Sequence, residues 1–181
     1  MVAVDEGFAV WLTGLPSSGK SVLARELRKQ MAGEGANAQI LDSDELRGVL
    51  TPESTYTERE RDWFYGVVGF LVELLTKNGV NVLVAATAPR RAYRDEARRR
   101  VRCFAEVFVD CPVEVCRSRD PKGLWQRAER GEIRNLPGAG ADYEPPFSPE
   151  VRVDTSALSI EECVRRIVER LSELGFWAPN P

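Results

Sequence analysis

The sequence predicts a three-layer α/β domain built on a mainly parallel β-sheet. Short, nearly continuous apolar runs alternate with segments of helical periodicity along the 181 residues, as in parallel strands joined by crossover helices. A glycine- and serine-rich turn follows the first apolar run directly. Folds of this class bind ligands at the carboxyl ends of their strands. The length predicts one domain spanning residues 1–181.

The first half of the chain contains three apolar runs of strand length and two helical patterns. We expect strands at 8–13, up to 39–41 and at 80–86, and helices at 21–30 and 58–77. The run VNVLVAA is apolar almost throughout, which is typical of a parallel strand covered on both faces. The long helix carries apolar residues at helical spacing, which predict one wide buried stripe: Trp63, Phe64, Val67, Val68, Leu71, Leu74 and Leu75. Gly79 is a plausible residue to end that helix.

The second half continues the alternation and contains one long irregular segment. We expect helices at 91–100, 113–118 and 160–171, and strands at 104–110 and 151–154. Residues 120–149 are rich in glycine, proline and charge and have little apolar periodicity. Structureless stretches of this length inside a compact domain are usually functional. We therefore expect this segment to be a lid or active-site loop.

Composition excludes several classes of protein. Lys and Arg number 25 against 28 Asp and Glu, and this net charge of -3 does not favour nucleic-acid binding. The chain has no histidine, which excludes His-dependent nucleophiles and His-ligated zinc. No apolar run approaches the ~18 residues of a membrane span, and the N-terminus lacks a signal-peptide pattern. Four cysteines without CxxC spacing predict buried free thiols and a cytoplasmic location: Cys103, Cys111, Cys116 and Cys163.

The most specific motif is the octapeptide GLPSSGKS between the first strand and the first helix. It fits the phosphate-binding pattern G-x-x-x-x-G-K-[ST] with Gly14, Leu15, Pro16, Ser17, Ser18, Gly19, Lys20 and Ser21. Backbone amides and the helix N-terminus would surround phosphate oxygens, while Lys20 would reach the β- and γ-phosphates. Ser21 would hold Mg²⁺. The motif predicts a P-loop NTPase fold of the nucleoside-kinase type that uses ATP and Mg²⁺; the alternative is a chance Gly/Ser turn.

Two carboxylates and an arginine follow the second strand, at the sheet edge that carries the phosphate loop. Asp42 and Asp44 are candidates for positioning Mg²⁺ water and for accepting a proton from an attacking hydroxyl. Arg47 is suited to bind an anionic substrate group with two hydrogen bonds. The alternative is structural: Ser43 or Asp44 would cap a short helix, and Arg47 would be solvated.

Several further segments resemble the adenylylsulfate (APS) kinase family, from Phe8 to about Leu171. Residues 120–125 (DPKGLW), with Ala128 and 131–133 (GEI), resemble the family's DPKGLY…A..GEI segment. Residues 142–146 (DYEPP) resemble PYE-x-P, and residues 109–116 (VDCPVEVC) resemble VDTPLEVC. The resemblance implies ATP-dependent phosphorylation of the 3′-hydroxyl of APS, giving 3′-phosphoadenylylsulfate (PAPS) and ADP. It also implies that the chain can form a homodimer.

The same resemblance implies roles for individual residues. Asp44 would lie nearest the reacting hydroxyl, Arg47 and Arg61 would contact the phosphosulfate, and Tyr56 would stack on the substrate base. Arg119 would lie beside the ATP adenine. The implied acceptor-binding set is Asp44, Arg47, Tyr56, Arg61, Lys122 and Leu136. In the alternative interpretation Tyr56 packs on its own helix and Arg119 is a solvated helix end.

The sequence departs from the family pattern around the acceptor. Phe64 stands where the family often has Asn, Gly66-Val67 where it often has Arg-Arg, and Ala88 where some relatives have a phosphorylated serine. Leu136 occupies the place of a second aromatic that would clamp the base. Two alternatives therefore stay open. One is a kinase of the same build for another small hydroxyl acceptor, such as a different nucleotide conjugate. The other is a nucleotide-binding regulatory protein without turnover.

Residues 90–102 form the densest basic patch of the sequence. We interpret it as a solvated helix face. The alternative is that Arg90, Arg91 or Arg94, at the strand end after Pro89, reaches a substrate phosphate.

Overall fold

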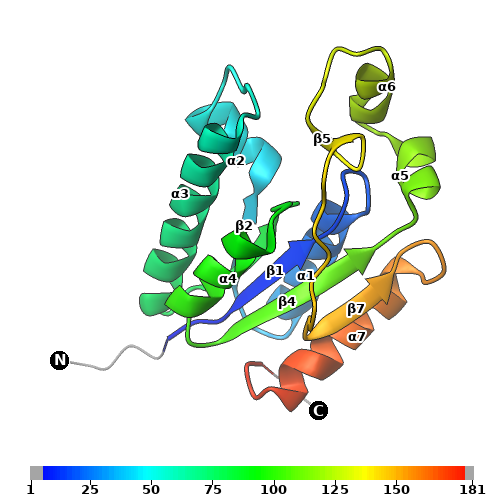
Figure 1. The fold of residues 1–181 in the computed structure, drawn as a ribbon. Coiled ribbons are helices and arrows are strands. Elements are labelled where there is room, and N and C mark those ends of the chain that lie inside the picture. The colour runs from blue at the N-terminus through cyan, green and yellow to red at the C-terminus, as the bar shows by residue number, and fades with distance from the viewer. Residues whose placement is uncertain (1–5, 178–181) are drawn as a thin grey trace.

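The computed structural model describes residues 6–177 and contains a five-stranded parallel sheet with the order β2-β3-β1-β4-β7 (Figure 1). The central strand β1 (Ala9–Thr13) lies between β3 (Asn81–Ala85) and β4 (Phe104–Asp110). β2 (Ala38–Asp42) and β7 (Val151–Asp154) form the two edges. The expected α/β class with a mainly parallel sheet is confirmed, and all five carboxyl ends lie along one edge of the sheet.

Helices cover both faces of the sheet, as the alternation of side chains along β1 requires. Val10 and Leu12 pack into a core with the apolar faces of α1 and α7. Ala9 and Trp11 pack into a second core with α3 and α4. The long helices are α1 (Lys20–Gly33), α3 (Glu58–Lys77), α4 (Arg91–Arg100) and α7 (Ile160–Glu173). Within the described residues no helix is long and apolar enough to cross a membrane.

The buried stripe expected along α3 is narrower than the apolar pattern indicates. Phe64 and Val68 are fully buried, but Trp63 and Leu74 keep 50% and 46% of their surface exposed. The reason is geometric, because the sheet and α4 cover only one side of α3, and its outer side faces solvent (Figure 1). Gly79 adopts the left-handed conformation one residue beyond the helix cap at Asn78, so its expected role in ending the helix is confirmed.

The segment 120–149 is not structureless, and this part of the prediction is wrong. It contains α6 (Leu124–Glu129) and a small sheet of β5 (Leu136–Pro137) and β6 (Gly140–Ala141). It follows the short helix α5 (Val113–Arg119). Trp125 is fully buried in a satellite core with Leu136. The Trp125 indole N–H donates to the carbonyl of Pro16 at 3.2 Å, so this segment is fastened directly to the phosphate loop.

The interpretation of residues 90–102 as a solvated face is wrong for two arginines. Arg94 is 1% exposed and its Nε pairs with Glu106 at 2.6 Å. Arg98 pairs with Glu150 at 2.7 Å. This network, buried at Arg94 and partly exposed at Arg98, joins α4 to β4 and to Glu150, directly after the segment 120–149.

The three arginines after Pro89 direct their charges at protein groups rather than at the phosphate loop. Arg90 pairs with Glu58, and the Arg91 side chain donates to the carbonyl of Pro145. Arg94 donates to the carbonyl of Ala88, whose backbone has a positive φ of 40°. The alternative in which one of them reaches a substrate phosphate is therefore not supported.

Replacement of Arg94 by methionine tests the buried network. Arg94→Met leaves the Glu106 carboxylate buried with only a longer 3.6 Å contact to Arg98, so we expect the free energy of unfolding to fall by about 3 kcal/mol. Arg99→Met is the matched control, because Arg99 forms a solvent-exposed pair on the same helix, and we expect a change within about 0.5 kcal/mol. Urea unfolding measures both. Equal losses in the two variants would contradict the structural role given to Arg94.

Candidate active site

The phosphate loop leaves the end of β1 and enters α1, and its backbone requires glycine at two positions. A Cβ at Gly14 would lie 2.3 Å from the carbonyl oxygen of Val109, so no larger residue fits. Gly19, just before α1, has a φ of 104°, a conformation that glycine adopts without strain. The loop therefore turns tightly and delivers Lys20 and Ser21 to the first turn of the helix.

Lys20 is buried in this loop and donates hydrogen bonds to the carbonyls of Gly14 at 3.0 Å and Leu15 at 2.7 Å. Burial lowers the pKa of Lys20 from 10.5 to about 8, although the nearby Asp44 carboxylate partly opposes this effect. A phosphate group in the loop would supply the negative charge that favours the protonated amine. The loop thus holds the Lys20 amine on neutral carbonyl groups, from which an anionic ligand can draw it away.

Asp42, the last residue of β2, joins two parts of the site. Its Oδ2 accepts a hydrogen bond from the Ser21 hydroxyl at 2.6 Å, and its Oδ1 accepts one from the backbone N–H of Asp44 at 3.0 Å. The second bond caps α2 (Ser43–Leu50), so the structural alternative with a cap at Ser43 or Asp44 is wrong. Asp42 takes this role because it has the extended backbone that N-cap residues adopt. Ser21 and Asp42 together present oxygen atoms of the kind that Mg²⁺ prefers.

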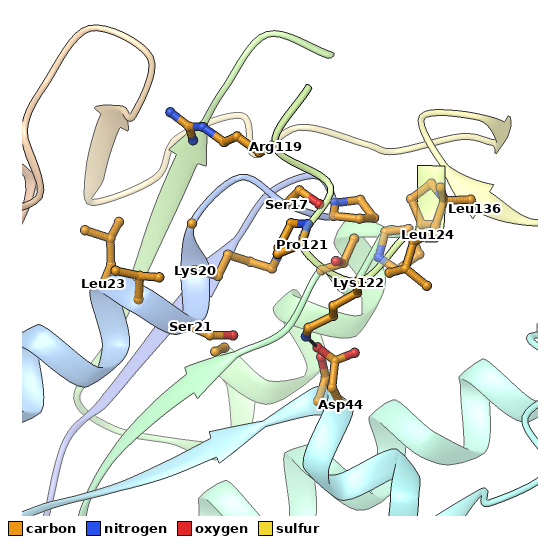
Figure 2. A pocket seen from close by; sticks show the side chains of 18 of the residues that line it. Ser17, Lys20, Ser21, Leu23, Asp44, Arg119, Pro121, Lys122, Leu124 and Leu136 are labelled. Carbon is orange, nitrogen blue, oxygen red and sulfur yellow. Dashed lines mark hydrogen bonds and ion pairs between the residues drawn. The ribbon is translucent and has the colours of Figure 1, made fainter. Parts of the chain in front are cut away.

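Asp44 points into the pocket from the first turn of α2 and forms an ion pair with Lys122 (Figure 2). Both side chains are about half exposed, at 53% and 51%. Lys122 lies in the segment 120–149, whereas Asp44 lies in the first turn of α2, just after the edge strand β2. The two sequence-predicted residues therefore meet across the mouth of the pocket, and a ligand can reach both.

Arg47 is buried and forms part of the wall of the pocket, so its alternative as a solvated residue is wrong. Its Nη1 donates to Glu60 at 2.9 Å, and its guanidinium lies 4.8 Å from the centre of the Tyr56 ring. Arg61 approaches the same space and donates to the carbonyl of Asn135. Burial lowers the pKa of Arg61, but an arginine remains charged at neutral pH. Tyr56 is thus partly covered by Arg47 on one side and lines the pocket.

Arg119 lies at the other end of the pocket, close to the phosphate loop. It donates to the Thr155 hydroxyl at 3.1 Å and to the Thr155 carbonyl at 2.6 Å. The same hydroxyl donates to the carbonyl of Ser18 at 2.8 Å. Arg119 is therefore fixed against the loop after β7 rather than loosely solvated, and the site includes Thr155, which the sequence reasoning missed.

Lys20, Ser21, Asp44, Arg47 and Arg119 all line one cavity of about 650 Å³. The predicted acceptor residue Leu136 contributes to its wall from the satellite core. Six cationic side chains line this cavity against the single carboxylate of Asp44: Lys20, Arg25, Arg47, Arg61, Arg119 and Lys122. A protein with a net charge of -3 thus concentrates positive charge at one place, which favours polyanionic ligands.

Sequence reasoning missed several wall residues. Thr87 follows β3, Thr155 follows β7, and Asn135 precedes β5. The rule that ligands bind beyond the carboxyl ends of parallel strands could have found the first two. Asn135 contributes through its backbone carbonyl to Arg61, and its position carries no comparable sequence signal.

Known proteins are similar to this chain in sequence and fold over nearly its whole length. The family described as Adenylylsulphate kinase matches residues 6–154. The adenylyl-sulfate kinase of Microcystis aeruginosa is 42% identical over 172 residues, which is 95% of each chain. A probable adenylyl-sulfate kinase of Pyrococcus abyssi is 40% identical and covers 94% of this chain and 98% of its own. The solved structure of the Mycobacterium tuberculosis APS kinase in complex with AMPPNP and APS is 33% identical, with a TM-score of 0.87, and covers 92% of this chain and 98% of that chain.

The lowered pKa of Lys20 generates a test of the phosphate loop. Between about pH 8 and 10.5 the buried amine is largely neutral. If a bound nucleotide restores the charge of Lys20, the amine must take up a proton from solution when the nucleotide binds. We expect proton uptake at pH 9 that disappears near pH 7, where Lys20 is already protonated. Calorimetric titration with a non-hydrolysable ATP analogue, in two buffers of different ionisation enthalpy, measures it. Lys20→Arg, which stays charged, should take up fewer protons at pH 9; equal uptake would contradict the assignment.

Proposed function

The chain belongs to the adenylylsulfate kinase family, and we propose that it is an ATP-dependent adenylylsulfate kinase whose phosphate loop, Asp42 and Asp44 carry the reaction. The enzyme transfers the γ-phosphoryl group of ATP to the 3′-hydroxyl of APS and forms PAPS and ADP. The observation that carries this conclusion is one continuous cationic cavity, which holds the phosphate loop at one end and the Arg47–Arg61 pair at the other. Two anionic nucleotides can therefore meet with their reacting groups between them.

The ATP half of the site rests on the loop at the start of α1. Backbone N–H groups of the loop and the positive end of α1 would bind the phosphates, and Lys20 would leave its two carbonyl partners for the β- and γ-phosphate oxygens. Arg119, held by Thr155, would lie against the adenine. These positions support the ATP-binding roles proposed for residues 14–21 and for Arg119.

The residues present fit a magnesium ion that arrives with ATP. Mg²⁺ is usually held by one or two protein oxygens together with substrate phosphates and water, and the Ser21 hydroxyl beside the Asp42 carboxylate provides such a pair. When bound, Mg²⁺ supplies charge neutralisation at the β- and γ-phosphates. Ser21 would hold the ion. Asp42 would orient Ser21 and fix the start of α2 relative to the phosphate loop.

The acceptor half of the site carries two arginines whose charges are suited to a phosphosulfate. Arg47 is held by Glu60, and burial of Glu60 acts to raise its pKa, but hydrogen bonds from Thr55 and Tyr56 keep that pKa below its ordinary value. Glu60 therefore stays ionised and keeps Arg47 in place. Tyr56 would cover one face of the base, and Leu136 would cover the other by apolar contact without aromatic stacking.

Asp44 and Lys122 lie where the hydroxyl and the transferred phosphoryl group would meet. We assign to Asp44 the orientation of the 3′-hydroxyl and the acceptance of its proton late in the transfer. Phosphate oxygens would compete with Asp44 for Lys122 and free the carboxylate for the hydroxyl. Residues 120–149, which carry Lys122 and Leu136, would act as the lid of a single kinase domain formed by residues 1–181. Four free thiols suit a reducing compartment such as the cytoplasm.

A kinase of the same build for a different small acceptor is the second candidate. The observation that favours it is the replacement of the base-clamping aromatic by Leu136. The test is ADP release with APS, with other adenosine and cytidine nucleotides and with no acceptor. We expect the highest kcat/KM for APS. A much higher kcat/KM for another acceptor would favour the second candidate, and ATP binding without turnover of any acceptor would favour a regulatory protein.

Asp44→Asn should separate the roles of the two carboxylates. We expect kcat to fall roughly 10²- to 10⁴-fold, because the amide cannot accept the proton, while ATP affinity changes little. Asp42→Asn should mainly weaken binding of Mg²⁺ and ATP, because the negative charge beside Ser21 is lost. The cap of α2 should survive, since Asn also caps helices well. Glu45→Gln, in the same helical turn, serves as the control. Steady-state kinetics with both substrates measures the effects; a greater loss of kcat in Asp42→Asn would mean that the two roles are reversed.

Arg61→Ala tests the anion site. Removal of a charged hydrogen-bond donor should raise the KM for APS roughly ten- to hundredfold, with the KM for ATP unchanged. The matched control is Arg59→Ala on the exposed side of the same helix, which should leave both constants near wild type. Similar KM values for APS in the two variants would remove Arg61 from the acceptor site.

A further inference from the structure

Arg47 stacks on the ring of Phe64, a contact that the sequence pattern does not predict. Its guanidinium carbon lies 3.9 Å from the centre of the Phe64 ring. Phe64 is fully buried in the core between α3 and the sheet, whereas Arg47 lines the cavity. Phe64 does not itself line the cavity and can influence the acceptor through that guanidinium or through Tyr65, a neighbouring ring that does line the cavity.

The contacts of Arg47 leave part of its donor fork unused by the protein. Among the described residues, its hydrogen bonds to Glu60 and to the Thr51 hydroxyl both use Nη1. The Tyr65 hydroxyl also lies near the guanidinium, and this proximity opposes the rise that burial causes in the pKa of Tyr65. The donors that Glu60 and Thr51 leave unused on Nε and Nη2 are those that a ligand could reach. A planar guanidinium stacked on an aromatic ring keeps its N–H groups in the plane of the stack, where they can still bind an anion with two parallel hydrogen bonds.

Glu60 fixes one edge of the guanidinium but does not fix the rotation of its plane about that edge. Glu60 is itself immobilised, because it accepts hydrogen bonds from the Thr55 backbone at 2.6 Å and from the Tyr56 backbone at 3.2 Å. The Phe64 ring at 3.9 Å and the Tyr56 ring at 4.8 Å supply the missing restraint. Phe64 also packs edge-on against Tyr65 with ring centres 5.2 Å apart, so its own orientation is fixed.

From this geometry we infer that Phe64 is a positioning residue for acceptor binding: its ring sets the plane of the Arg47 guanidinium so that Nε and Nη2 face the anionic group of the acceptor. The inference rests on the proposed function, since it concerns the acceptor half of that site. On this inference, tight binding of the acceptor's anionic group requires an arginine stacked on Phe64. A positive charge at position 47 without a planar group is not sufficient for tight binding.

The experiment is a double-mutant cycle on Phe64→Leu and Arg47→Lys, measured as KM and kcat for APS and KM for ATP. Leucine fills the core without offering a π face, and lysine keeps the charge without a planar group. Each single variant should raise the KM for APS about tenfold, with the KM for ATP unchanged and kcat near wild type. In the Arg47→Lys background Phe64→Leu should add little, because no guanidinium remains to be stacked.

A matched core variant separates positioning from general destabilisation. Phe104→Leu removes a buried ring from the same core and should lower thermal stability without changing the KM for APS. Effects of Phe64→Leu and Arg47→Lys that multiply in the double variant would overturn the inference, as would equal increases in the KM for ATP and for APS. If Phe64→Leu does not fold, Arg47→Lys decides alone: an unchanged KM for APS would overturn the inference.

Failure of the proposed function is visible in the wild-type enzyme. If wild type phosphorylates another anionic acceptor and not APS, the proposed function is wrong, and the same cycle measured with that acceptor still tests the role of Phe64. An unchanged KM for that acceptor in both single variants would overturn the inference as well.

Discussion

The carboxylate of Asp42 is the contact on which the geometry of the site depends. One oxygen accepts from Ser21 at the start of α1 and the other caps α2 through the backbone of Asp44. Because Asp42 ends β2, the sheet itself sets the distance between the phosphate loop and the residues that would face the acceptor. A shift of this side chain would move Ser21 and Asp44 together. The positions of both halves of the site are therefore set by the same carboxylate.

A second set of contacts closes the site from the opposite side. The indole of Trp125 donates to the carbonyl of Pro16, and Arg94 donates to the carbonyl of Glu144, so two points of the segment 120–149 are anchored. Lys122, on the same segment, reaches Asp44 across the cavity. Residues 120–149 are therefore fastened to the phosphate loop at one point and to α4 at another.

Local patterns predicted most of the fold and the ATP half of the site, because strands, helices and the GLPSSGKS loop are specified by neighbouring residues. The rest depends on contacts that are distant in sequence. The burial of Arg94 looks the same in the sequence as the exposure of Arg99, and the bond from Trp125 to Pro16 spans 109 residues. Apolar periodicity does not show which part of α3 remains uncovered, as the exposure of Trp63 illustrates.

The most direct measurement is identification of the phosphorylated product by ³¹P and ¹H NMR after incubation of the enzyme with Mg²⁺, ATP and APS. We expect a new phosphomonoester at the 3′-oxygen of APS, formed in equal amount with ADP. A phosphoryl group on a different hydroxyl, or ADP formed without a phosphorylated acceptor, would contradict the placement of the 3′-hydroxyl between Asp44 and the phosphate loop.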